Sequence, residues 1–303
     1  MDRHSLPFAL LLFFITITPG LASEPEVHSF ATPANIEQPL PAISIIIDDL
    51  GEQLTTGERA VALPGDITYA FLPHTSHTRL LAELAHRHDK EIMLHMPMQA
   101  VGENELGEGG LTLDMSRQRF IEALIESINA VPHISGINNH MGSLLTQHPG
   151  HMHWLMEALQ QRNDLFFVDS RTTDRTVAYQ IATEYEIPRI NRNIFLDNVR
   201  SELEISKQFE QLVALAKRNG TAVAIGHPYP ETIAFLEKVL PTLEQRGIEL
   251  IRTSNIIKRK QLIEVTIPQA MFAARTTPDK ADAKGNPHQS LRDSGAPQPA
   301  TIQ

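Results

Sequence analysis

The sequence predicts an α/β fold in which a parallel sheet is covered by helices. Between residues 42 and 260, short apolar runs rich in β-branched residues alternate with segments whose apolar residues recur at helical spacing. The connections are short, and several runs end in a polar residue able to bind a ligand. Such alternation is typical of parallel sheets with crossover helices. It fits an open, doubly wound sheet or a closed barrel, and the spacing alone does not distinguish them.

The predicted elements follow one another along the whole domain. The strands cover 43–47, 67–71, 91–96, 134–138, 165–169, 190–196, 221–225 and 248–251, and the helices cover 55–63, 77–86, 117–129, 151–161 and 202–218, with another beginning near 231. The first strand, ISIII, is apolar on both faces, as expected of a buried parallel strand. In helix 117–129, Phe120, Leu124 and Ile128 share one face. Gly220 is placed to end the helix at 202–218.

The two ends of the chain differ from this domain in composition. Residues 1–22 carry Arg3, an apolar run at 8–17 and small residues before Ser23, which is typical of a cleaved signal peptide; an uncleaved anchor is the alternative. After cleavage we expect no stable membrane span. Residues 23–41 read as a proline-rich linker and 261–303 as a disordered polar tail, the alternative being a short helix around Ala270.

Composition limits the location and the partners. The chain has no cysteine, which excludes lipoprotein attachment and disulfides. Export without disulfides fits a periplasmic or secreted protein of a bacterial envelope. The net charge of −10 argues against nucleic acid, whose binding requires clustered basic residues.

Side chains that can bind a metal or transfer a proton lie at the carboxyl ends of several predicted strands. These are Asp48-Asp49, His95, Asn138-Asn139-His140, Asp169 and Gly226-His227-Pro228. In parallel α/β folds that edge forms the binding site, so we expect these residues to converge. Two histidines and a carboxylate are a common ligand set for a hydrolytic divalent ion, most often Zn²⁺. A second carboxylate can act as a base and a further histidine as an acid. The pattern indicates metal-assisted hydrolysis of an amide, an ester or a phosphoester.

Other polar segments have simpler interpretations. We expect the remaining histidines of the domain to lie in loops or on the surface: His74, His77, His86, His88, His148, His151 and His153. Methionines 96 and 98 pack a loop in this interpretation, because thioether sulfur suits soft ions. The acidic, glycine-rich stretch 103–110 reads as a mobile loop, with a lid over the site as the alternative.

Six motifs together resemble a known family. They are IIIDDLG (45–51), LHMPMQ (94–99), GINNHMGS (136–143), FVDSRT (167–172), IFLDN (194–198) and AIGHPYPETI (224–233). In order and spacing they are similar to the divergent polysaccharide deacetylases, the YibQ-type branch of the NodB-like carbohydrate esterases. The resemblance spans about residues 42–255. It implies an irregular (β/α) barrel, a divalent metal, an acetylated envelope glycan as substrate and an exported protein.

The resemblance also implies roles for single residues. Asp48 corresponds to the general base, Asp49 to a metal ligand and His227 to the acid, and the backbone near Met141 or Gly142 to an oxyanion donor. The family's second motif has two histidines four residues apart, and here His95 is followed by Gln99. His140 is the best replacement ligand. Asp169 is the second choice, or orients a ligand.

The substitution at Gln99 leaves three functions to compare. The first is a zinc-dependent hydrolase that removes N- or O-acetyl groups from a carbohydrate polymer, with Asn138 and Asn139 donating hydrogen bonds to sugar or acyl oxygens. The second is a non-catalytic envelope protein that keeps the fold and binds glycan or a protein partner. The third is a phosphoesterase, which ranks last because the clustered Lys or Arg expected around phosphate is absent.

Overall fold

One parallel sheet organises the domain. The computed structural model describes residues 39–102 and 105–262, so the predicted signal peptide, most of the linker and nearly all of the tail lie outside the described residues. The strands are β1 (Ala42–Leu50), β2 (Thr68–Phe71), β3 (Glu91–Met98), β4 (Ile134–Met141), β5 (Phe166–Asp169), β6 (Arg189–Asn191), β7 (Ile194–Phe195), β8 (Thr221–Gly226) and β9 (Glu249–Leu250). Their order is β6-β5-β4-β3-β2-β1-β8-β7, with β9 beside β1, and every pairing is parallel.

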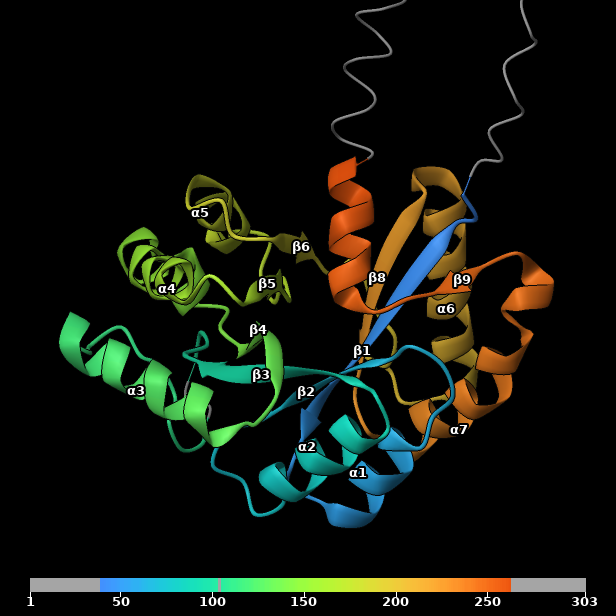
Figure 1. Cartoon of the computed structure of the whole chain (residues 1–303), viewed down its shortest axis with the longest axis horizontal. Helices are drawn as coiled ribbons and strands as arrows, with labels where there is room; N and C mark the ends of the chain where they lie inside the picture. Colours follow the sequence, from blue (N-terminus) through green and yellow to red (C-terminus); the bar gives the residue numbers. More distant parts are fainter. Residues whose placement is uncertain (1–38, 103–104, 263–303) are drawn as a thin grey trace, which may run out of the picture. The chain divides into compact units, whose positions relative to one another are not determined.

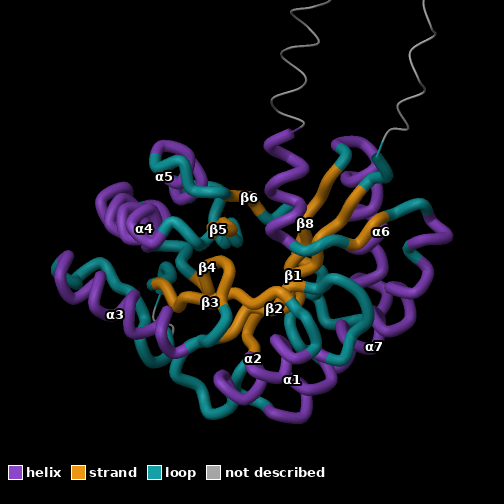
Figure 2. Tube along the Cα trace, in the orientation of Figure 1, coloured by secondary structure: helices purple, strands orange, loops and turns teal. Residues whose placement is uncertain are grey.

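Helices cover the outside of this sheet. They are α1 (Leu54–Val61), α2 (Thr78–Arg87), α3 (Arg117–Ala130), α4 (Pro149–Arg162), α5 (Ala178–Glu184), α6 (Glu202–Asn219) and α7 (Pro230–Val239), followed by a last helix at 253–262. The strands form an inner ring and the numbered helices an outer layer (Figures 1 and 2). In the described part of the chain, no helix has the length and apolar character needed to cross a bilayer.

The ring is closed by the chain itself rather than by a ladder of hydrogen bonds. β6 and β7 stand at opposite ends of the strand order, yet only Arg192 and Asn193 separate them in sequence. The amide of Arg192 donates to Asp169 on the β5 side, and the amide of Asn193 donates to Val223 in β8. The three residue steps from Asn191 to Ile194 span at most about 11 Å when fully extended, so the sheet must curl until its ends nearly meet. The fold is therefore an irregular (β/α) barrel, as predicted.

The crossing also corrects one predicted strand. The run 190–196 is not continuous, because the Asn193 side chain accepts a hydrogen bond from the Val223 amide and redirects the chain into a new pairing. α5 and the helix at 253–262 were not predicted. Both helices are short. In the helix at 253–262 the buried apolar residues are Ile256 and Ile257, which are adjacent, so the sequence shows no apolar spacing typical of a helix.

Strand alternation divides the apolar residues into two clusters. Along β1, Ile43, Ile45 and Ile47 pack toward the helices, whereas Ala42 and Ile46 face the barrel interior. The interior cluster also contains Ala70, Met93, Phe166, Val168, Ile190, Val223, Ile225, Ile251, Ile256 and Ile257. The helix at 253–262 thus supplies apolar side chains to the inside of the barrel.

A closed polar network lies at the amino end of the strands. The Thr253 hydroxyl is 2.8 Å from that of Ser44 and donates to Thr68, and the Thr68 hydroxyl donates to the Glu91 carboxylate. Glu91 also accepts from the backbone amide of Ser254 in the first turn of the last helix. A chain of hydroxyl donors ending on a carboxylate leaves each of these buried groups with a hydrogen-bond partner.

Candidate metal centre and active site

The carboxyl end of β1 brings two successive carboxylates to one place. In a regular strand Asp48 and Asp49 would point to opposite faces. Here the register between β1 and β2 shifts between Ile47 and Leu50, and Asp49 has a φ of 55°. This left-handed conformation is uncommon outside glycine, although Asp tolerates it better than most residues. Both carboxylates consequently face His95, whose Nε2 is 3.6 Å from Asp48 and 3.1 Å from Asp49.

Asn138 holds Asp48 and His95 in their orientations. Its amide nitrogen donates to both oxygens of Asp48, at 2.8 and 3.0 Å. Its amide oxygen is 2.8 Å from Nδ1 of His95 and accepts the proton there. In its neutral form, the His95 imidazole then carries its lone pair on Nε2, which faces Asp49 and His140. Asn138 is therefore engaged within the protein, in place of the substrate hydrogen bond suggested from the sequence.

His140 completes a group of three facing donor atoms. Its Nδ1 is 2.8 Å from Oδ1 of Asp49 and 3.1 Å from Nε2 of His95. Ligand atoms from Asp49, His95 and His140 all lie within 4.8 Å of one another. Oδ1 of Asp49 is buried and, despite these short distances, makes no hydrogen bond of acceptable geometry. Three lone-pair donors, the buried Asp49 oxygen and one nitrogen from each histidine, suit a cation between them, and imidazole and carboxylate are ligands that Zn²⁺ accepts.

The two aspartates have opposite protonation preferences. Burial raises the pKa of Asp48, although His95 and His227 oppose the shift. Burial also acts to raise the pKa of Asp49, but the His140 and His95 imidazoles outweigh it and hold that pKa well below its usual value. A carboxylate that stays ionised suits a metal ligand, and one with a raised pKa suits a base working near neutral pH.

Gln99 occupies the position where the family pattern has its second histidine, and it has structural partners. Its side-chain oxygen accepts from the amide of Leu113, and its backbone oxygen accepts from Leu144 and Leu145. Its amide donates to Leu111. Gln99 thus ties the end of β3 to the loops on both sides of it, while His140, one strand over, provides the imidazole.

His227 is held by an aspartate that the sequence analysis did not select. Nδ1 of His227 is 2.8 Å from Oδ1 of Asp197, and Oδ2 of Asp197 accepts from the His227 amide and the Thr232 hydroxyl. Burial lowers the pKa of His227, but Asp197 and the nearby Asp49 and Asp48 outweigh it and raise the pKa to about 9. Its Nε2 is 3.8 Å from Asp49, so the ring faces the candidate metal ligands. The sequence did contain a signal for Asp197, because in the motif IFLDN (194–198) this aspartate follows a predicted strand directly.

Two other predicted residues lie away from the three donor atoms. Asp169 accepts from the Arg171 amide and the Thr176 hydroxyl. Its neighbour Val168 faces the barrel interior, so alternation turns Asp169 toward the helices, where it fixes the loop before α5. The Asn139 amide nitrogen donates to the Met141 carbonyl, and its oxygen accepts from the Ser170 amide. Asn139 therefore shapes the loops and is engaged internally.

The backbone after β4 turns sharply beside the donor atoms. Met141 has a φ of 52° and Gly142 a φ of 87°. A Cβ on Gly142 would lie 3.1 Å from that of Met98. Any other residue at this position would therefore have both an unfavourable backbone conformation and a close contact with Met98. The carbonyl of Gly142 accepts from the amide and hydroxyl of Thr146. An oxyanion-binding role for Met141 or Gly142 remains a prediction.

One histidine prediction was wrong. His151 is buried, with 5% of its surface exposed, and packs against Phe120 and Trp154. Burial lowers its pKa, as does the neighbouring His148, which favours the neutral imidazole in this core position. His74, His86, His88 and His148 are exposed, as expected. In the loop 103–110, residues 103 and 104 lie outside the described residues.

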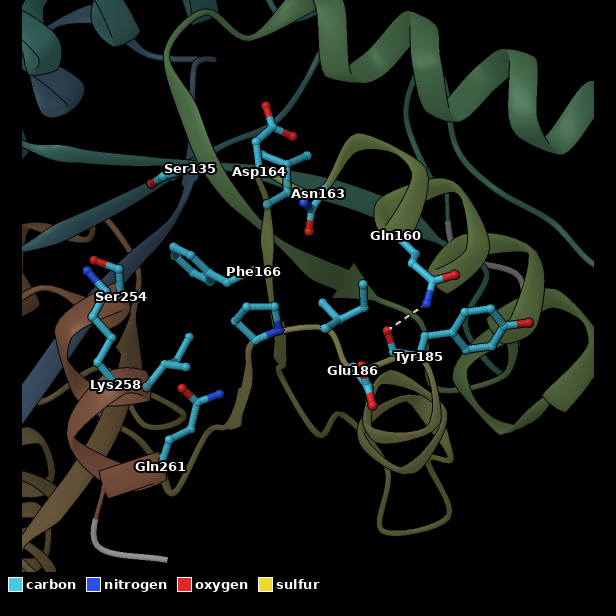
Figure 3. A pocket seen from close by; sticks show the side chains of 14 residues that line it. Ser135, Gln160, Asn163, Asp164, Phe166, Tyr185, Glu186, Ser254, Lys258 and Gln261 are labelled. Carbon is cyan, nitrogen blue, oxygen red and sulfur yellow. Dashed lines mark hydrogen bonds between the residues drawn. The ribbon is translucent and has the colours of Figure 1, made fainter. Parts of the chain in front are cut away.

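A separate hollow lies at the other end of the strands. It has a volume of 510 Å³ and is bounded by Phe166, by Tyr185 and Glu186, and by Ser254 and Lys258 of the last helix (Figure 3). None of the candidate residues lines it. It is therefore distinct from the candidate active site.

Comparison with known proteins agrees with the geometry. Residues 45–257 match the model of the family described as divergent polysaccharide deacetylase. The chain is 34% identical over 246 residues to the uncharacterised protein YibQ of Escherichia coli, covering 80% of this chain and 76% of YibQ. It is 37% identical over 221 residues to an uncharacterised Haemophilus influenzae protein, covering 73% and 78%.

A solved structure supports the same fold. The uncharacterised protein ATU2773 from Agrobacterium tumefaciens superposes with a TM-score of 0.70 at 23% identity, over 72% of this chain and 90% of that one. Because the family model spans most of the chain and two relatives exceed 30% identity, this protein belongs to the divergent polysaccharide deacetylase family.

Proposed function

We propose that this protein is a metal-dependent hydrolase that removes acetyl groups from an envelope glycan. One observation carries the proposal: Asp49, His95 and His140 bring three donor atoms together, and the one from Asp49 is a buried carboxylate oxygen that lacks a good hydrogen bond. Family membership supports a carbohydrate polymer as the substrate class. The predicted signal peptide supports a periplasmic or secreted location.

Each of the site's other residues has a role in this reaction. When bound, the metal, for which we propose Zn²⁺, would polarise the acyl oxygen and acidify a water molecule. Asp48, held by Asn138, takes a proton from the attacking water. The water oxygen bonds to the acyl carbon, and the bond from that carbon to the sugar nitrogen or oxygen breaks. His227, kept protonated by Asp197, gives its proton to that leaving atom, which releases acetate and the free sugar.

The metal content of the purified protein tests the ligand assignment. We expect about one divalent ion per chain in the wild type, and its loss in His140→Ala. His88→Ala is the matched control, since His88 is an exposed histidine. Full metal content in His140→Ala would refute the assignment.

Acetate release from acetylated oligosaccharides tests the reaction. We expect turnover in the metal-loaded wild type and none in His140→Ala. The alternative, a non-catalytic glycan-binding protein, is favoured by Gln99 at the position of the family's second histidine. Absence of metal even after incubation with zinc, together with glycan binding, would establish that alternative.

A further inference from the structure

Two arginines and three rings form a continuous stack beside the candidate active site. The Arg192 guanidinium lies 3.7 Å from the centroid of Phe195, whose ring stacks on His227 at 6.2 Å. His227 stacks on Tyr229 at 5.3 Å, and Arg200 covers the other face of Tyr229 at 3.5 Å. The stack therefore connects the proposed acid, His227, directly to Arg200.

The two arginines differ in how their hydrogen-bond donors are used. Arg192 is partly buried and donates to the carbonyls of Ser170 and Arg171, at 2.6 and 2.8 Å. Arg200 is exposed and hydrogen-bonds the Tyr229 hydroxyl, and among the described residues no carboxylate lies within ion-pair distance of it. The acidic residues that follow it are engaged elsewhere: Glu202 pairs with Lys238, and Glu204 with Lys207.

Arg200 borders a hollow that also contains a proposed metal ligand. The hollow has a volume of 360 Å³ and is lined by Asp49, Glu52, Arg200 and Tyr229 among others. Of its lining residues, all within the described ranges, Arg200 is the only base. Glu52 also lines a second hollow on the side of His140, so it stands between the two spaces. A chain bound at the metal ligands and extending along the first hollow would meet the Arg200 guanidinium.

We propose that Arg200 determines specificity by binding a carboxylate or phosphate group on the glycan, next to the sugar that is deacetylated. This inference rests on the proposed function and names its substrate class, an acidic glycan. The Arg200 guanidinium lies over the Tyr229 ring, and the planar fork of a guanidinium can form two parallel hydrogen bonds to an anion. In a protein with a net charge of −10, an arginine that has no carboxylate partner among the described residues offsets the repulsion that Asp49 and Glu52 exert on an acidic ligand.

Binding of sugars without acetyl groups tests this proposal independently of turnover. Calorimetry on the full chain would compare trigalacturonate, mannotriose bearing a 6-phosphate, and neutral mannotriose. We expect at least one acidic trimer to bind about tenfold or more tightly than the neutral one, and the preference to disappear in Arg200→Gln. The better acidic trimer identifies the anion as a carboxylate or a phosphate. Arg200→Lys should keep part of the preference, because lysine retains the positive charge. It should lose the rest, because lysine lacks the planar pair of N–H donors.

Arg218→Gln is the matched control. It removes the same charge from the exposed far end of α6, about 27 Å from the end that Arg200 precedes. An unchanged acidic preference in Arg200→Gln, an equal loss in Arg218→Gln, or no preference in the wild type would each overturn the proposal.

Turnover separates this inference from the proposed function. Acetate release would be compared for acetylated oligogalacturonates and acetylated xylo-oligosaccharides. The proposed specificity predicts that the ratio of the two kcat/KM values falls about tenfold in Arg200→Gln. Acetate release without an acidic preference would retain the hydrolase and refute the role of Arg200. Charge-dependent binding without acetate release would retain Arg200 and refute the hydrolase.

Discussion

The two ends of the barrel both bury polar groups, but they use them differently. At the amino end, Ser44, Thr68, Glu91 and Thr253 satisfy one another through a chain of hydrogen bonds. At the carboxyl end, a buried oxygen of Asp49 lacks a good hydrogen bond although it lies among imidazoles. A saturated network stabilises a fold, whereas an unsatisfied group among potential ligands indicates a binding site. This difference predicts which substitutions affect chemistry and which affect stability.

The largest effect should come from Asp49→Ala. Loss of this carboxylate removes the anionic member of the three donors, so we expect loss of the metal and of detectable acetate release. Elemental analysis and an acetate assay measure both. A chelator should lower the melting temperature of the wild type and leave that of Asp49→Ala unchanged, because only a protein that binds the metal is stabilised by it. If Asp49→Ala retained the metal, the unsatisfied Asp49 oxygen would not mark a metal site, and the proposed difference between the two ends of the barrel would be refuted.

Asp48→Asn should separate the base from the metal ligands. We expect kcat to fall about 10³-fold, the loss typical of a missing general base, with metal content unchanged. An uncharged amide at this buried position removes one of the two acceptors of the Asn138 amide, so we expect a loss of about 1–3 kcal/mol in the free energy of unfolding. Urea unfolding checks that point. A variant that loses metal as well would place Asp48 among the ligands.

Asp197→Asn should change the pH dependence of the reaction. In the wild type the pKa of His227 is raised to about 9, so its acidic form is present below that pH and is lost as the pH rises through it. Without the Asp197 charge, the alkaline limb of kcat/KM should move toward the usual pKa of about 6.5. At pH 8 we expect a loss of about 10- to 100-fold. Identical alkaline limbs in the two proteins would exclude His227 as the acid.

Thr253→Val should have the smallest effect, and on stability alone. It removes the hydroxyl that links Ser44 to Thr68 and leaves the shape nearly unchanged. We expect a loss of about 1–3 kcal/mol in the free energy of unfolding, measured in urea, with kcat/KM unaffected. Thr253→Ser keeps the hydroxyl and should stay within about 1 kcal/mol of the wild type. A drop in kcat/KM for Thr253→Val would show that the two ends are coupled.

Sequence reasoning predicted that the candidate residues converge, because parallel strands bring their carboxyl ends to one edge of the sheet. Asp48, Asp49, His95, His140 and His227 all follow from that rule. The rule does not say which face a side chain takes, and Asp169, one residue beyond an inward-facing Val168, turns toward the helices instead.

Other features depended on contacts that no local pattern carries. The left-handed backbone at Asp49 arises where the β1–β2 register shifts, and Asp197 became visible only through its hydrogen bonds to His227. The break between β6 and β7 depends on Asn193 pairing with Val223 in a strand that comes thirty residues later in the chain. Hydrophobic spacing predicts elements, and such long-range pairings decide where they bend.

The two-residue crossing between β6 and β7 has a consequence for the order of folding. From β1 to β6 each new strand can add to the one before it, and these contacts are comparatively local. The edge of β1 opposite β2 pairs with β8, which comes much later in the chain. There Ala42 pairs with Thr221, a contact of high sequence separation. Such contacts carry a large loop-closure entropy and form slowly. His227 follows β8 directly, so the proposed acid joins the proposed base only when this long-range ladder between β1 and β8 forms, and the candidate active site is incomplete until then.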